Sequence, residues 1–73
     1  MNERIIIDPE ICHGKPTIRG RRVPIVRIID GLAGGMTREE VMREYEVTEE
    51  DIAAALSYAA RLIEAEEVHP LPV

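Results

Sequence analysis

The chain has 73 residues, enough for one domain, and a domain this small buries too little apolar surface to be more than marginally stable on its own. Its composition, 45% hydrophobic and 32% charged, is globular, and no apolar run is long enough to suggest a membrane span. The single cysteine excludes an internal disulfide and fits a reducing compartment, so we expect a cytoplasmic protein. Because a chain of this size has no disulfide to stabilise it, we also expect it to be stabilised by forming an oligomer or by binding a partner.

The net charge of -5 is unevenly distributed along the chain. Residues 1–30 carry six basic against four acidic side chains, whereas residues 31–73 carry three arginines against ten acids. An acidic chain is a poor general binder of nucleic acids, because phosphate contacts supply most of the non-specific affinity. A local basic patch can still bind an anionic partner.

The first third of the chain predicts short strands joined by turns. Residues 5–7 are three β-branched isoleucines, and Asp8-Pro9 ends that strand because proline cannot donate to a ladder. Residues 17–19 and 21–23 predict two further strands around a turn at Gly20. We therefore expect a β-hairpin or a small sheet before the helices.

Two helices are predicted to follow. Pro24 suits a first helical position, and Gly34-Gly35 suits the end of that helix. Its apolar face, at helical spacing, consists of Ile25, Ile28, Ile29 and Leu32. The run Thr37-Arg38-Glu39-Glu40 is a capping-box pattern that starts a second, shorter helix. The apolar positions of that helix are Val41, Met42 and Tyr45.

A third helix is predicted from about residue 49 to about residue 66, after a second capping signal at residues 48–51. The stripe expected to face the core is Ile52, Leu56, Ala59 and Ile63. Residues 52–60 are small or apolar almost all round, which is typical of a helix buried on more than one side. We therefore expect a second copy to cover the face formed by Ala54, Tyr58, Arg61 and Ala65. The alternative is that alanine is simply a good helix former on a tolerant surface.

These elements predict a mainly α fold: a three-helix, helix-turn-helix type bundle with a short N-terminal β-hairpin or small sheet. Residues 1–73 form one domain, with a basic β/turn segment at 1–23, the three-helix bundle at 24–67 and a non-helical tail at 68–73. That tail is expected either to be frayed or to dock on a partner.

Catalytic and metal sites have little support in the sequence. Cys12-His13 lacks the further ligands that structural zinc requires, so no metal and no cofactor are predicted. Gly14-Lys15-Pro16 lacks the earlier glycine and the following hydroxyl of a phosphate loop. No nucleophile, base and orienting group occur in a usable pattern, so we do not expect an enzyme.

The strongest functional signal is a cluster of four cations within eight residues, which also contain Pro16 and Gly20 and directly follow Gly14. It consists of Lys15, Arg19, Arg21 and Arg22. Arginine forks suit carboxylates and phosphates. Three interpretations follow. The cluster could bind an acidic protein surface such as a metal-binding nuclease site, or it could contact DNA phosphates. It could also be a solvated loop that pairs with the acidic third helix. Ordinary DNA reading is disfavoured, because the N-terminal end of the third helix is Glu49-Glu50-Asp51.

Four segments together resemble the domain-of-unknown-function 433 family, and the resemblance covers about residues 5–63. The segments are Gly14-Lys15-Pro16-Thr17-Ile18-Arg19-Gly20, Arg22-Val23-Pro24-Ile25, residues 31–40 and residues 48–59. The chain departs from the family pattern at Arg21, where threonine is usual, and in the turn at residues 45–48, which is one residue shorter and lacks a common proline.

The resemblance implies a homeodomain-like helix-turn-helix domain and a role as a VapB-type antitoxin in a bacterial toxin–antitoxin pair. The implied partner is a PIN-like ribonuclease toxin with an acidic magnesium site. Our hypothesis is that Arg19, Arg21 or Arg22 enters that site and neutralises the nuclease. Two alternatives stay open: a DNA-binding autoregulator that recognises an operator as a homodimer, and a purely structural homo-oligomerisation module.

Overall fold

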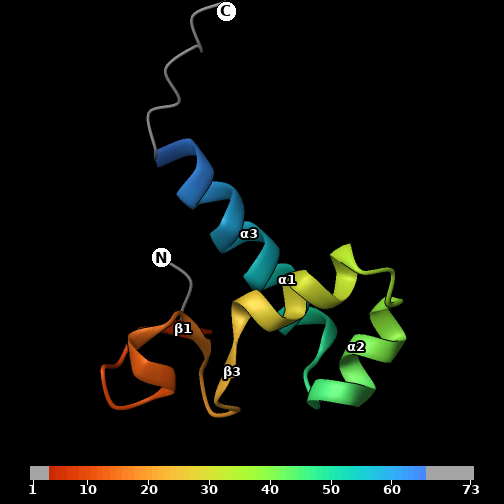
Figure 1. Cartoon of the computed structure of the whole chain (residues 1–73), viewed down its shortest axis with the longest axis horizontal. Coiled ribbons are helices and arrows are strands. Elements are labelled where there is room, and N and C mark those ends of the chain that lie inside the picture. The colour runs from red at the N-terminus through yellow and green to blue at the C-terminus, as the bar shows by residue number, and fades with distance from the viewer. Residues whose placement is uncertain (1–3, 66–73) are drawn as a thin grey trace, which may run out of the picture.

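The computed structural model of the chain describes residues 4–65, which form a small sheet followed by three helices (Figure 1). The strands are β1 (Ile5–Ile6), β2 (Thr17–Ile18) and β3 (Val23–Pro24), with a short helical turn, η1 (Cys12–Gly14), between β1 and β2. The helices are α1 (Ile25–Ala33), α2 (Arg38–Tyr45) and α3 (Glu49–Ala65). The fold is thus mostly helical with a three-stranded antiparallel sheet. The predicted tail at 68–73 lies outside the described residues.

The three strands pair antiparallel in the order β1-β2-β3. Ile5 lies opposite Ile18, which in turn lies opposite Val23. Both residues of the central strand are buried, with Thr17 and Ile18 each only 1% exposed. A two-residue strand has little pairing energy of its own, so the sheet depends on packing this central strand against the helices.

The hairpin between β2 and β3 differs from the predicted pairing. Arg21 and Arg22 belong to the turn and not to the third strand, which begins at Val23. Gly20 (φ +81°) and Arg22 (φ +55°) both adopt the left-handed conformation, which reverses the chain and excludes a regular strand. Pro24 was expected as the first helical residue. It has extended backbone (φ -62°, ψ 138°), ends the edge strand and precedes α1.

Both predicted capping boxes are present. The Thr37 hydroxyl accepts from the Glu40 N–H at 3.1 Å, and the Glu40 carboxylate accepts from the Thr37 N–H at 2.8 Å. At the start of α3, Thr48 and Asp51 exchange the same pair of bonds, at 3.1 and 2.9 Å. Because each cap satisfies N–H groups that a helix leaves unpaired, both helices begin where the sequence predicts.

The core lies where the three helices meet the central strand. Its buried apolar residues are Ile5, Ile18, Ile25, Ile28, Val41, Val47, Ile52, Ala54 and Ala55. From the predicted apolar positions of α1 and α2, Ile25, Ile28 and Val41 are buried, and Ile29, Leu32, Met42 and Tyr45 pack beside them. The helical spacing of these side chains therefore predicted their burial correctly.

Two predictions for α3 are wrong. From the expected core stripe, Ile52 is fully buried, but Leu56 and Ile63 are 39% and 65% exposed. Ala54, expected to face another copy, is only 4% exposed and belongs to the chain's own core. One reason is orientation: the side of α3 that faces the core carries Ala54, Ala55 and Tyr58, and Leu56 lies beside it. The other reason is length: α3 has 17 residues, about 25 Å at 1.5 Å per residue, so Ile63 lies in the part that projects beyond the other elements (Figure 1).

The other three residues of the expected interface do not form one free apolar face. Tyr58 is half-buried against the core, and Arg61 donates to the Ser57 hydroxyl at 3.3 Å one turn earlier. Ala65 is exposed at the end of α3. None of the helices within residues 4–65 is both long and apolar enough to cross a bilayer.

The burial pattern gives a stability prediction with a matched control. Ile52→Ala should lower the free energy of unfolding by about 3 kcal/mol, because it removes a fully buried side chain and leaves a cavity. Ile7→Ala makes the same chemical change at a side chain that is 60% exposed, and should cost less than about 1 kcal/mol. Urea unfolding followed by circular dichroism measures both. Equal losses would contradict the core described above.

Candidate functional site: the basic loop and Asp51

The four cations of the predicted cluster come from two turns that touch each other. The first turn, η1, is left-handed, with φ of +50° at Cys12, +56° at His13 and +80° at Gly14. Backbone bonds from Gly14 to Ile11 and from Lys15 to Cys12, both 3.1 Å, hold it closed. Lys15, whose side chain is exposed, follows this turn and is separated from the central strand by Pro16.

The second turn, residues 19–22, joins β2 to β3; together with Lys15 we name it the basic loop. The Arg21 N–H donates to the Ile18 carbonyl at 3.2 Å, and the Arg19 N–H donates to the Arg4 carbonyl. The Cys12 thiol donates to the Arg22 carbonyl at 3.3 Å. This last bond ties the two turns together, so Lys15 and Arg22 are carried by one connected piece of backbone.

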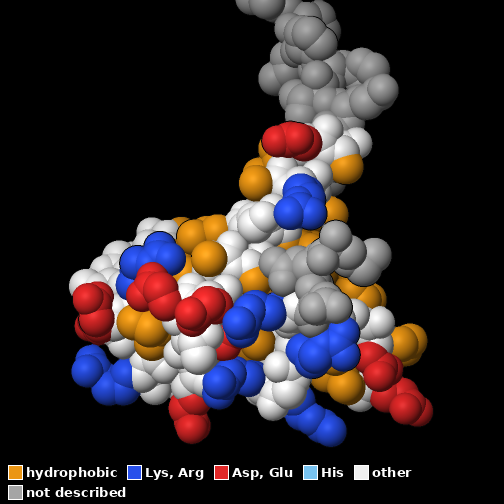
Figure 2. All heavy atoms as spheres, turned by 180° about the vertical axis from the view of Figure 1, so that it is seen from behind, with side chains coloured by type: hydrophobic (Ala, Val, Ile, Leu, Met, Phe, Trp, Pro, Cys, Tyr) orange, Lys and Arg blue, Asp and Glu red, His pale blue; other side chains and the backbone are white. Residues whose placement is uncertain are grey.

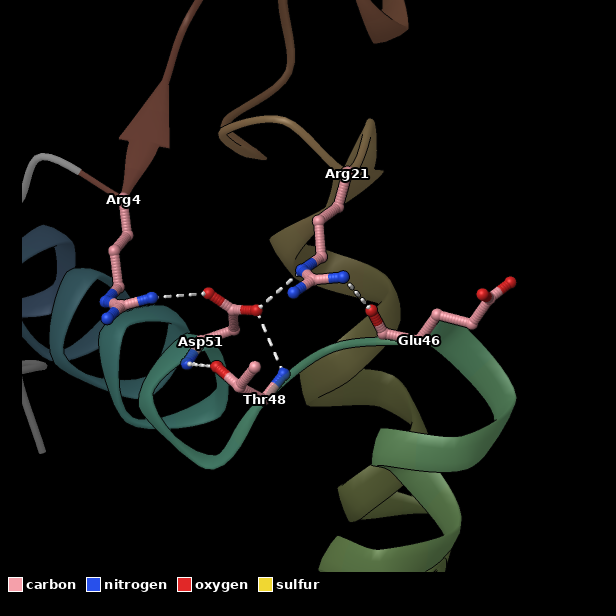
Figure 3. A network of polar contacts seen from close by, with 5 residues as sticks. All are labelled: Arg4, Arg21, Glu46, Thr48 and Asp51. Carbon is pink, nitrogen blue, oxygen red and sulfur yellow. Dashed lines mark hydrogen bonds and ion pairs between the residues drawn. The ribbon is translucent and has the colours of Figure 1, made fainter.

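Arg21 points back into the protein, where it meets a buried carboxylate. Its Nε lies 3.1 Å from Oδ2 of Asp51, and its Nη1 donates to the Glu46 carbonyl at 2.7 Å (Figure 3). Arg4 approaches the same carboxylate from the other side, with Nη1 3.1 Å from Oδ1. The Asp51 side chain is only 4% exposed. We name Asp51, Thr48, Arg4, Arg21 and the Glu46 carbonyl the Asp51 network.

The Asp51 carboxylate is held in its charged form. Burial raises its pKa, but the bonds from Thr48 and the neighbouring Arg4 and Arg21 guanidinium groups outweigh that effect, so the pKa lies below its ordinary value of 3.8. At α2, the Thr37 cap likewise lowers the pKa of exposed Glu40. The buried negative charge at Asp51 is therefore balanced by positive charge from two distant segments.

This network corrects the predicted role of Arg21. The sequence grouped it with three other cations for binding a partner, whereas the structure places it in a contact with α3. The reading in which the loop pairs with the acidic third helix is thus confirmed for this residue. Arg19 and Arg22 remain exposed on the turn, as does Lys15 on the neighbouring one. Within residues 4–65, neither Lys15 nor Arg22 forms an ion pair.

Sequence reasoning missed Asp51 and Arg4 as members of this site. Asp51 was read only as a helix cap and as an acid at the positive end of a helix dipole. Its partners lie 30 and 47 residues away along the chain, beyond any local pattern. One signal was available: Arg21 is one of the two places at which the chain departs from the family pattern.

Basic side chains are concentrated on the body of the molecule. On the face drawn in Figure 2, most Lys and Arg side chains lie over the lower body, among acidic and apolar side chains, and apolar side chains also appear along the projecting part. No group of three or more His, Cys, Asp and Glu side chains in residues 4–65 is placed to hold a metal ion. His13 is exposed and Cys12 half-exposed on their turn.

The Asp51 network predicts how stability depends on pH. Because the folded pKa of Asp51 is lowered, its contribution is complete above the unfolded value near 3.8 and is lost as the pH falls through the folded value. Asp51→Asn should remove charge-assisted bonds worth about 2 kcal/mol at neutral pH and flatten the acid limb of the stability curve. The measurement is urea unfolding at a series of pH values from neutral to strongly acidic.

A matched control removes the same charge elsewhere. Glu44→Gln neutralises an exposed side chain on α2, and at neutral pH it should change the free energy of unfolding by less than about 0.5 kcal/mol. If Asp51→Asn is as harmless as Glu44→Gln, the network does not stabilise the fold.

Comparisons with known proteins give relatives but no activity. The chain is 36% identical over 66 residues to the uncharacterized protein Rv2308 of Mycobacterium tuberculosis; the match spans 84% of this chain but 28% of that protein. It superposes with a TM-score of 0.76 on the crystal structure of a DUF433 member from Anabaena variabilis, at 30% identity, over 85% of this chain and 62% of the other. The chain therefore spans about a quarter of the first relative and slightly less than two thirds of the second.

A family match completes the comparison. Residues 5–59 match the family described as protein of unknown function (DUF433). That range begins in β1, includes the basic loop and ends in the first two-thirds of α3, so it contains both turns and the whole Asp51 network except Arg4. On the strength of that match, this chain belongs to the DUF433 family.

Proposed function

We propose that this protein is the antitoxin of a bacterial toxin–antitoxin pair, and that its basic loop binds and neutralises a PIN-like ribonuclease in the cytoplasm. The proposal assigns the chain a binding role and no catalysis. The observation that supports it most is that the cations of the basic loop differ in their contacts. Arg21 forms an ion pair with Asp51, whereas Lys15 and Arg22 are exposed and form no ion pair within residues 4–65.

The loop is built to present those cations with little loss of entropy. Arg21 fixes one side of the turn to α3, and the Cys12 thiol fixes Arg22 to the other turn. A ligand that binds a preorganised loop does not have to order it, so more of the contact energy appears as affinity. A PIN-like active site is a cluster of carboxylates that holds magnesium. Guanidinium and ammonium groups can occupy such a cluster in place of the metal or of the RNA phosphate.

The helices are part of the same proposal. We propose that α2 and α3 form a helix-turn-helix pair of homeodomain-like arrangement, because a tight turn at residues 46–48 joins them and Glu46 adopts the left-handed conformation (φ +55°) there. This arrangement does not by itself favour DNA. The first turn of α3, the part that would enter a major groove, consists of Glu49, Glu50 and Asp51, which would repel phosphates.

The first test identifies the partner. A tagged full-length chain is recovered from its native host at moderate salt, and co-eluting proteins are identified by mass. The expected result is a stoichiometric partner with an acidic, PIN-like nuclease site. DNA co-purification with salt-sensitive gel shifts on upstream DNA, and no protein partner, would overturn the proposal in favour of an autoregulator.

The second test addresses the loop itself. Arg22→Ala should weaken inhibition of the nuclease by at least about tenfold, as expected when a charge at the centre of an interface is removed. Arg61→Ala removes the same charge from the projecting half of α3 and should leave inhibition unchanged. The readout is the inhibition constant on an RNA substrate, with thermal melting to show that both variants fold. Full inhibition by Arg22→Ala combined with Lys15→Ala would contradict the assigned site.

A further inference from the structure

The projecting half of α3 carries apolar side chains that the rest of the described chain leaves uncovered. Within residues 4–65, five large apolar side chains are exposed: Ile7, Val26, Leu56, Leu62 and Ile63. Three of them lie on α3 after Ala55, where the helix leaves the core, and Val26 lies on α1. Because three of the five lie on one half of one helix and are not scattered singly over the surface, they are a candidate interaction site.

An apolar groove lies beside these side chains. It has a volume of about 360 Å³ and runs between the start of α1 and the projecting half of α3. Its lining consists of Lys15, Pro16, Ile25, Val26, Ile29, Ala59 and Leu62. The long aliphatic stem of lysine can line such a groove while its ammonium stays in water. The groove therefore extends the apolar face from α3 to α1.

The order of residues on α3 identifies what covers this face. Leu56, Ala59, Ala60 and Ile63 follow one another at helical spacing, so they share one side of the helix. Read in the opposite direction, the pattern is the same: large, small, small, large. A second copy of α3 running antiparallel, with the two-fold axis between Ala59 and Ala60, would place Leu56 against Ile63 and alanine against alanine. The small residues would let the two helices approach closely at the crossing.

We propose that this face is an antiparallel dimer interface in which α3 of each copy packs on α3 and the adjacent groove of the other. A closed two-fold contact requires a surface that is complementary to itself, and this palindromic stripe is such a surface. The proposal does not depend on the antitoxin assignment. It also differs from the face expected from the sequence, because Ala54 is buried and Arg61 and Ala65 lie on the opposite side of α3 from Ile63.

The area of the interface determines how strong the dimer should be. The stripe from Leu56 to Ile63 is about 10 Å long on a helix about 10 Å wide, a footprint of only about 100 Å². A stable interface buries about 800 Å² on each partner. Even with Val26 and the adjacent apolar groove added, the contact stays well below that area, so the dimer we propose is weak and forms at high protein concentration.

The first test is the oligomeric state of the full chain, measured by light scattering and sedimentation from micromolar to millimolar concentration. The chain should be a dimer, and Ile63→Arg should weaken the dimer by at least about tenfold. Ala65→Arg adds the same side chain on the opposite side of α3 and should leave the dimer intact. A chain that is monomeric throughout, or a dimer broken by Ala65→Arg and not by Ile63→Arg, overturns the proposal.

A cross-linking experiment tests the antiparallel register. Leu56→Cys and Ile63→Cys are prepared separately, each with Cys12→Ser, mixed and mildly oxidised. The mixture should form the disulfide between the two variants, and neither variant alone should form its own. Efficient self-cross-linking of each variant would indicate a parallel pair, and no cross-linking would place the interface elsewhere; either outcome overturns the arrangement. Because both positions are exposed, circular dichroism should show unchanged helix content.

Discussion

A single buried carboxylate connects most of the segments of this small domain. Asp51 caps α3 through Thr48 and accepts from Arg21 on the hairpin turn and from Arg4 before β1. Burying a charge is costly unless it is paired and hydrogen-bonded. The negative charge at Asp51 is tolerated only when both arginine-bearing segments are in place. The start of α3, the sheet and the basic loop are therefore positioned together.

The same network determines what the basic loop presents to solvent. Like charges on two neighbouring turns repel one another, and the Asp51 carboxylate offsets part of that repulsion. Arg21 turns inward to this carboxylate and also holds the Glu46 carbonyl at the end of α2, while Lys15 and Arg22 stay on the surface. One ion pair thus stabilises the fold and orders the surface assigned to partner binding.

The long third helix divides into two halves with different surroundings. Its first half supplies Ile52, Ala54 and Ala55 to the core, and its second half leaves the body with Leu62 and Ile63 exposed. A domain of 73 residues has a limited core, and a helix extending beyond it gains nothing from its apolar side chains unless another surface covers them. The proposed dimer face and the basic loop share Lys15, which lines the groove, whereas Arg22 is not part of that lining. The two proposed interactions therefore overlap at Lys15 and are separate at Arg22.

The sequence alone determined the features that depend on neighbouring residues. Both capping boxes, the three helices and the small sheet before them follow from local patterns, because caps and turns are made by groups a few residues apart. Only the tertiary structure decided which side of α3 faces the core, since its alanines are compatible with either side and the choice depends on where the body ends. It also decided that Arg21 binds inward, because its partner Asp51 lies 30 residues away and no local spacing encodes that contact.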